Sequence, residues 1–193
     1  MKILRPAIVL TLFFVLVTGL AFPFLVTGIA QAVFPHQANG SMIESDGKVV
    51  GSALIGQSFS DERFFHPRPS SGGYDANNSG GTNLGPTNPK LLTGAEGFEG
   101  VQQLAERFRA INEVATDVVL PVDAVTRSAS GLDPHITVKN ARLQAARVAR
   151  ANGMSKEAVD QMIREFTEVP LLGLGEEPYI NVLEINRRVA QPR

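Results

Sequence analysis

An uncharged apolar run near the N-terminus constrains this chain more than any other feature. None of the 27 residues from Ile8 to Phe34 is charged, and 17 of them are Leu, Ile, Val or Phe. As a helix, a run of this length reaches roughly 40 Å, which exceeds the roughly 30 Å hydrocarbon core of a bilayer. Its large apolar side chains favour insertion by about 5–10 kcal/mol. The run predicts a transmembrane anchor within residues 1–34.

A cleaved secretory signal peptide is the alternative interpretation of this run. Lys2 and Arg5 fit the basic start of such a peptide, and residues 30–32 (AQA) fit an A-x-A cleavage site. The apolar stretch, however, is much longer than the roughly 7–15 residues that signal peptides use. We therefore favour a retained anchor. Within it, Gly19, Pro23 and Gly28 either kink the helix, admit a neighbouring helix, or are simply tolerated.

Basic residues flank only one end of the run. Lys2 and Arg5 precede it, whereas residues 35–44 contain no Lys or Arg. The positive-inside rule then places Met1 in the cytoplasm and residues 35–193 on the other side of the membrane.

Residues 35–193 predict one α+β domain with most of its helix in the C-terminal half. This part contains all 19 acidic residues against 16 basic ones, so no basic field suggests nucleic-acid binding. The chain has no cysteine, which excludes disulfides, thiol catalysis and zinc–thiolate or iron–sulfur sites.

Hydrophobic spacing and capping residues predict the elements of this domain. Residues 179–186 fit both a strand and a helix. The other expectations are a strand pair or bulged strand within 48–59, an amphipathic helix over 96–114, a strand-like start to 120–127, a helix capped by Thr137 and ending at Ala151, and a helix from Ser155 to about Glu168.

Residues 67–89 form a segment in which 18 of 23 residues are Gly, Pro, Ser, Thr or Asn. Such composition is typical of flexible linkers, but Tyr74, Leu84 and four prolines favour a long ordered loop. The run Ser79, Gly80, Gly81, Thr82 and Asn83 is a candidate for contact with a partner, with an ion path or with an anion.

No motif for catalysis or metal binding is present in the sequence. His36, His66 and His135 lie far apart, without the spacing of a metal site, and neither a nucleophile elbow nor a phosphate-binding glycine loop occurs. Lys139, Arg142 and Arg150 fall on one side of the predicted helix, where a solvated face is the default interpretation and binding of phosphate or of an acidic partner the alternative. We therefore expect no catalytic residue and no metal site, and favour an accessory or binding subunit.

Seven blocks of the sequence carry a more specific signal. They are residues 5–7 (RPA), 35–41 (PHQANGS), 51–57 (GSALIGQ), 65–70 (FHPRPS), 79–84 (SGGTNL), 128–133 (SASGLD) and 181–186 (NVLEIN). In this order they closely resemble the KdpC family, the small C subunit of the bacterial Kdp potassium-transporting P-type ATPase.

The resemblance implies a subunit of a four-subunit complex in the bacterial inner membrane. Together with the orientation expected from the flanking charges, it predicts a single-pass protein whose residues 35–193 lie in the periplasm. The expected partners are membrane lipid, a channel-like A subunit that selects potassium, a B subunit that hydrolyses ATP through an aspartyl phosphate, and a small F subunit. The phosphorylation motif DKTGT is absent here, so hydrolysis is expected on a partner. The chain is then expected to hold no cofactor of its own, while the complex handles ATP and the potassium ion.

The family is also described as a catalytic chaperone that raises the ATP affinity of the B subunit. A helix glutamine proposed to contact nucleotide matches Gln144 here, although many relatives have proline where this chain has Ala146. An external domain conflicts with direct contact to cytoplasmic ATP. We therefore favour a buried, structural Gln144, a cap over the external mouth of the channel subunit, and an indirect effect on ATP. A membrane-anchored hydrolase or a processed binding protein acting alone remain as alternatives.

Overall fold

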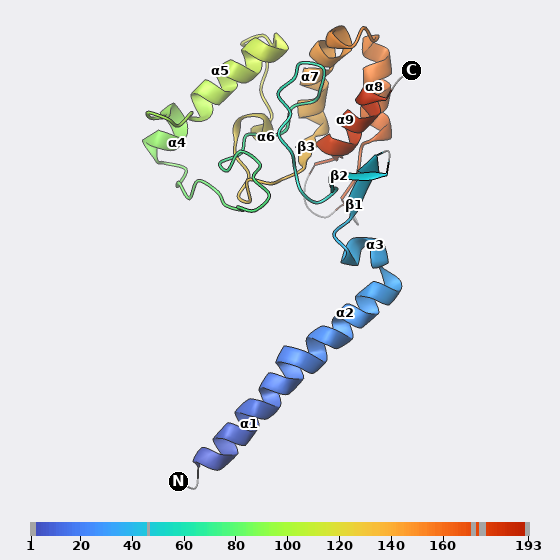
Figure 1. Cartoon of the computed structure of the whole chain (residues 1–193). Coiled ribbons are helices and arrows are strands. Elements are labelled where there is room, and N and C mark those ends of the chain that lie inside the picture. Colours follow the sequence, from blue (N-terminus) through green and yellow to red (C-terminus); the bar gives the residue numbers. More distant parts are fainter. Residues whose placement is uncertain (1–2, 46, 171–172, 174–176, 192–193) are drawn as a thin grey trace. The chain divides into compact units, whose positions relative to one another are not determined.

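A computed structural model describes residues 3–45, 47–170, 173 and 177–191 of the chain. It is mixed helix and strand, with one long apolar helix at the N-terminus, and this confirms the predicted fold class (Figure 1). The chain divides into two compact units, residues 1–52 and residues 53–193. The predicted boundary at residues 34 and 35 marks the end of the anchor, and it stays a prediction.

The first unit is dominated by a continuous helix from Leu4 to Val33, made of α1 (Leu4–Leu16), the π-helical turn η1 (Val17–Ala21) and α2 (Phe22–Val33). Its mean hydropathy is 2.5 and its side chains are exposed, as a membrane anchor requires. This fits the membrane anchoring expected from the sequence.

The wide turn of this helix has a clear cause in the sequence. Pro23 has no amide hydrogen to donate to the carbonyl of Gly19, and its ring crowds that carbonyl. The preceding amide, that of Phe22, bonds back five residues to Val17. The chain therefore accommodates the proline by widening one turn, which is a common solution in helices.

A short helix and a hairpin complete the first unit. They are α3 (Pro35–Ala38), β1 (Met42–Ser45) and β2 (Lys48–Ser52), with β1 and β2 antiparallel and their register shifted between Ile43 and Glu44. The predicted strand pair within 48–59 is confirmed only in part, because β2 ends at Ser52 and its partner precedes it. Beyond Ser52 the chain packs instead on a distant turn, where the Gly56 amide donates to the carbonyl of Leu132 at 2.8 Å.

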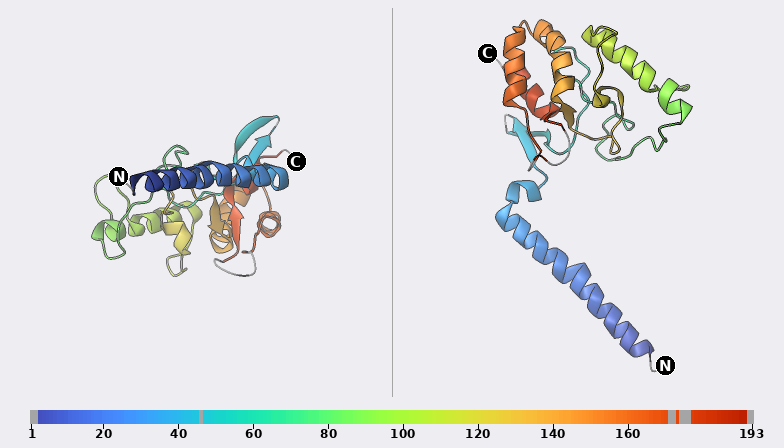
Figure 2. Two further views of the ribbon diagram at one scale, coloured as in Figure 1. Left: turned by 90° about the horizontal axis from the view of Figure 1, so that it is seen from below. Right: turned by 180° about the vertical axis from the view of Figure 1, so that it is seen from behind.

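The second unit contains six helices and one two-stranded sheet among the described residues (Figure 2). In chain order they are α4 (Pro89–Thr93), α5 (Val101–Asn112), α6 (Val122–Val125), β3 (His135–Thr137), α7 (Val138–Ala151), α8 (Lys156–Glu165), β4 (Tyr179–Asn181) and α9 (Val182–Ala190). Strands β3 and β4 are antiparallel, with Ile136 opposite Ile180.

The predicted helices are confirmed, with a shorter span for the first. Helix α5 occupies 101–112 of the expected 96–114, and the side chains of Thr137 and Ser155 cap α7 and α8 as expected. Residues 179–186 contain both expected structures, since β4 ends where α9 begins. The strand-like start expected for 120–127 is wrong. Pro121 has an extended backbone, and the short helix α6 begins directly after it.

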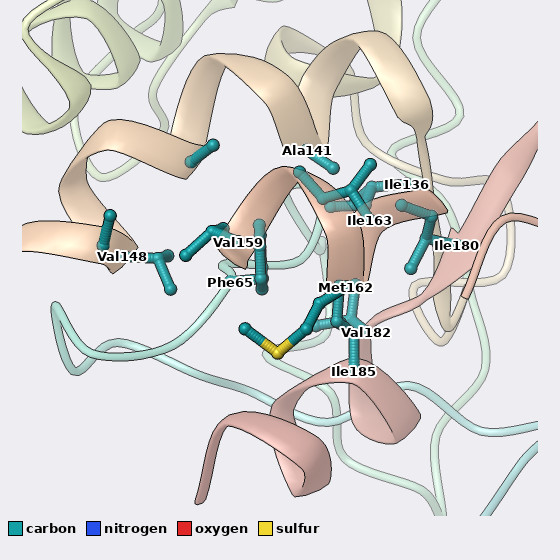
Figure 3. Close-up of a cluster of buried hydrophobic side chains, with 12 residues drawn as sticks. Phe65, Ile136, Ala141, Val148, Val159, Met162, Ile163, Ile180, Val182 and Ile185 are labelled. Atoms are coloured by element: carbon teal, nitrogen blue, oxygen red, sulfur yellow. The ribbon is translucent and has the colours of Figure 1, made fainter. Parts of the chain in front are cut away.

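The core lies where α7, α8, α9 and the β3–β4 pair meet (Figure 3). Helix α7 turns small side chains, Ala141 and Ala145, toward this core, and α8 packs directly against this helix. Phe65 is the largest side chain in the cluster and is fully buried, although it comes from a segment without helix or strand. Phe65 therefore anchors the segment between β2 and α4 to the core.

Candidate functional site

A stripe of polar side chains runs along the buried face of α7. Asn140, Gln144 and Arg147 are spaced by four and three residues, which places them on one face of a helix, and each is at most 2% exposed. The helix begins at a cap in which the Thr137 hydroxyl accepts a hydrogen bond from the Asn140 amide. The stripe therefore has its position fixed from the first turn of α7.

Hydrogen bonds join this stripe into a continuous chain, which we call the α7 network. Asp123 of α6 accepts from the amide and hydroxyl of Thr137 and, at 2.9 Å, from the side chain of Asn140. Asn140 in turn accepts from Gln144 at 2.9 Å, and Gln144 accepts from Arg147 at 2.8 Å. The network therefore has an anionic group at one end and a cationic group at the other.

Gln144 also pairs with the backbone of His66. Its Nε2 donates to the His66 carbonyl at 3.0 Å, and its Oε1 accepts from the His66 amide at 2.7 Å. Asn186 of α9 does the same for the preceding residue, since it accepts from the Phe65 amide at 2.8 Å and donates to the Phe65 carbonyl at 2.9 Å. Two side-chain amides thus replace the strand partner that this buried backbone lacks.

Arg147 closes the network on the other side of the same segment. Its guanidinium donates to the carbonyls of Glu62 and Phe64 and, at 2.9 Å, to the side chain of Asn112 in α5. Burial lowers the pKa of Arg147 to about 10, so the group is still protonated at neutral pH. Burial and the nearby charge of Arg147 also lower the pKa of His66, which favours its neutral form.

The structure assigns Gln144 a place inside the fold. Both hydrogens of its amide nitrogen and both acceptor positions of its oxygen are used by His66, Asn140 and Arg147. This is the buried, structural arrangement favoured from the sequence. The contact with nucleotide that the family resemblance implies stays a prediction, and it would require these bonds to open.

The polar segment 67–88 has neither helix nor strand, and hydrogen bonds hold it against the turn at 128–131. The Gly80 amide donates to the Ser130 carbonyl at 2.8 Å, and the Gly80 carbonyl accepts from Ser71. Gly81 lies so close to this turn that a Cβ atom would be 2.9 Å from the Ala129 oxygen. These contacts support an ordered loop, and the choice between it and a flexible linker stays a prediction.

The five candidate residues of this loop do not act as one group in the structure. The Gly80 amide is already occupied, so it is not a free donor for an anion. Ser79 is exposed, bonds the Ser130 carbonyl at 3.2 Å and lies at the edge of a groove of about 720 Å³. Asn83 adopts the left-handed region with φ of 54°, and Thr82 is half-buried. Contact of this run with a partner or an ion path stays a prediction.

The basic stripe predicted on α7 is exposed, as the default interpretation expected. Lys139 and Arg150 form ion pairs with Glu177 and Glu113 at 2.7 and 2.8 Å, and Arg142 is also on the surface. Arg147 is the basic residue of this helix that points inward.

A cleft of about 470 Å³ was not anticipated from the sequence. It lies between the segment 58–74 and helix α5, and it contains three arginines, namely Arg68, Arg107 and Arg127. These residues are 20 to 59 positions apart in the chain, so no local sequence pattern predicts that they line the same cleft. Among the described residues, no group of three His, Asp or Glu side chains is arranged to hold a metal ion.

Comparison with known proteins gives a consistent match over almost the whole chain. Residues 4–191 match the family model described as KdpC, the c chain of K⁺-transporting ATPases. A potassium-transporting ATPase KdpC subunit of Rhodospirillum rubrum is 50% identical over 190 residues, which cover 96% of this chain and 94% of that protein. Proteins with the same description from Mycobacterium tuberculosis (H37Rv) and Bradyrhizobium diazoefficiens are 48% and 47% identical, and each alignment covers 95% of this chain.

Proposed function

This chain belongs to the KdpC family of K⁺-transporting ATPase subunits, and we propose that it acts as a non-catalytic cap and assembly subunit on the external side of the membrane. The domain would sit over the mouth of a channel-like subunit in a high-affinity, ATP-driven potassium uptake complex of the bacterial inner membrane. Hydrolysis of ATP would take place on a P-type partner subunit, and a small fourth subunit would complete the assembly.

The single observation that carries the proposal is the asymmetry of the anchor. One apolar helix, Leu4–Val33, is preceded by Lys2 and Arg5 and is followed by residues 35–44 without a basic side chain. The positive-inside rule therefore favours an external domain. Cytoplasmic ATP would then lie across the bilayer from this domain.

The same orientation makes the effect on ATP indirect in our proposal. A catalytic chaperone that never touches nucleotide acts by binding the nucleotide-competent state of its partners more tightly than the other state, which is a coupling free energy. The complete internal bonding of Gln144 supports this, because no donor or acceptor of that side chain is left for a ligand.

Affinity purification of a C-terminally tagged chain from detergent-solubilised membranes tests this function. We expect recovery of two large membrane subunits together with potassium-stimulated ATPase activity. Removal of residues 35–193 is expected to weaken assembly and potassium transport together. Full transport supported by the anchor alone would contradict the cap, and a lone 20.7 kDa protein in several mild detergents would contradict the complex.

A further inference from the structure

We propose that the cleft between segment 58–74 and helix α5 is a docking surface for an acidic segment, flanked by apolar residues, of a partner subunit of the ATPase. The inference rests on the membership of this chain in a multisubunit ATPase and assigns a surface that the cap proposal leaves open. All residues of the cleft belong to the compact unit 53–193.

The lining of the cleft is mixed, and its apolar part is firmly supported. Leu104 and Ala124 lie in its lining and are only 2% and 5% exposed, so they belong to the packed body of the domain. Phe59 and Phe108 contribute aromatic rings to the lining. A volume of about 470 Å³ is within the range of sites that hold one ligand of moderate size, or a few side chains of a docked segment.

Among the described residues, Arg127 is the arginine of the cleft that forms no ion pair. Arg107 pairs with Glu99 at 2.7 Å, and Arg68 pairs with Asp133 at 2.6 Å. Arg127 donates from one nitrogen to the Glu99 carbonyl, and within the described part of the chain no carboxylate lies within 4.0 Å of it. The Glu99 carboxylate, which lies in the same lining and pairs with Arg107, acts on Arg127 from beyond that distance. The three arginines therefore share two carboxylates, Glu99 and Asp133, and the cleft keeps an excess of positive charge.

Arg127 is also held in place and partly desolvated. Its guanidinium carbon lies over the Phe98 ring, 4.3 Å from the ring centre, where a cation–π interaction helps to hold the group. Burial lowers the pKa of Arg127, because removal from water disfavours its charged form. An incoming carboxylate would stabilise the charged form again. The fork of an arginine matches a carboxylate in two parallel hydrogen bonds.

A protein segment fits this combination better than a lipid headgroup does. Aromatic side chains and arginine are the residues enriched at the centres of protein interfaces, where they act as anchors in pockets that exclude water. Here they occur together around a lining that is partly apolar. The charge complement is an Asp or Glu beside one or two apolar side chains.

Cysteine labelling in the assembled complex tests the surface directly, because the chain has no cysteine of its own. Ser60 is exposed and lies in the cleft, and Lys156 is exposed at the start of α8. We expect maleimide to label Ser60→Cys at least tenfold more slowly in the purified complex than in the separated full-length chain. Lys156→Cys should change by less than twofold. If assembly slowed the labelling of Ser60→Cys no more than that of Lys156→Cys, the proposal would be overturned.

A benzophenone reagent on the same Ser60→Cys chain identifies the occupant. Cross-linking to a partner subunit supports docking of protein. Cross-links to lipid alone, or none in a complex that is intact, would overturn it. Failure of the partner subunits to co-purify at all would instead count against the proposed complex, so the two ideas fail separately.

Charge variants test the role of Arg127. We expect Arg127→Gln to weaken binding of this chain to the remaining subunits at least tenfold at low salt. Arg127→Lys should restore only part of that loss, because lysine keeps the charge but not the two parallel hydrogen bonds. Arg150→Gln serves as control, because Arg150 is exposed, lies outside the cleft and has its own carboxylate partner. Equal binding by Arg127→Gln and Arg150→Gln chains would refute the role of this cation.

Discussion

Gln144 is a polar side chain in the centre of this domain, and its hydrogen bonds explain why it is buried there. It holds both backbone groups of His66 while it links Asn140 to Arg147, so a single amide joins α7 to a segment 78 residues away. Buried polar groups stabilise a fold only when every partner is present. The described residues meet this condition, since no buried side-chain nitrogen or oxygen among them lacks a hydrogen bond.

Replacement of this amide by an apolar side chain of similar size is therefore expected to be costly. Gln144→Leu leaves the His66 backbone and parts of Asn140 and Arg147 without partners, and each buried group of this kind costs about 1–3 kcal/mol. We expect a loss of roughly 2–5 kcal/mol in the free energy of unfolding, measured by urea denaturation of the full chain in detergent.

Arg142→Gln on the exposed side of the same helix is the matched control for this variant, and we expect a change within about 0.5 kcal/mol. An unchanged unfolding midpoint for Gln144→Leu would contradict the structural role. A stable Gln144→Leu chain that still lowered the ATP affinity of the complex would favour direct nucleotide contact.

The sequence revealed only part of this site. The spacing of Asn140, Gln144 and Arg147 is visible in the helical pattern, and the exposed basic side of α7 was predicted correctly. The other halves of the contacts were not visible, because Asn186 and Phe65 are 121 residues apart and Asn112 and Arg147 are 35 apart. Long-range amide contacts leave no local signature in a single sequence.

Elements with local causes were the predictable ones. The hydroxyls of Thr137 and Ser155 each accept a hydrogen bond from the backbone amide three residues later. Neighbouring residues therefore determine where α7 and α8 begin. The strand-like start expected for 120–127 was wrong because tertiary contacts override its apolar pattern. Asp123 bonds Thr137 and Asn140, and this holds the short helix α6 in place.

Two adjacent glycines test the order of the polar loop. A Cβ on Gly81 would lie 2.9 Å from the backbone oxygen of Ala129, whereas a Cβ on Gly80 would have no heavy atom within 4 Å. Gly81→Ala is therefore expected to displace the loop and to lower the free energy of unfolding by about 1–3 kcal/mol. Gly80→Ala should change it by about 0.5 kcal/mol or less.

Urea denaturation and the rate of proteolytic cleavage within residues 67–89 measure this difference. Faster cleavage in Gly81→Ala alone is the expected result. If both variants were cleaved at the same rate, the conformation of the loop would not depend on the contact between Gly81 and the turn at 128–131. That result would contradict an ordered loop.

At the scale of the whole molecule, the side of the membrane on which residues 53–193 lie decides between direct and indirect action on ATP. Only Lys2 and Arg5 set the predicted orientation, so an experiment on topology carries great weight. We expect single cysteines at Ser79 and Lys156 to react with a membrane-impermeant maleimide in intact spheroplasts, because both positions are exposed on this unit.

Leu4→Cys at the other end of the anchor is the control, and it should react only after the membrane is permeabilised. Two reporters on the domain distinguish topology from local cover, since a docked partner that hides Ser79 would not also be expected to hide Lys156. Protection of both until permeabilisation would place the domain beside cytoplasmic ATP. The cap would then be excluded, and opening of the Gln144 bonds by nucleotide would become the mechanism to test.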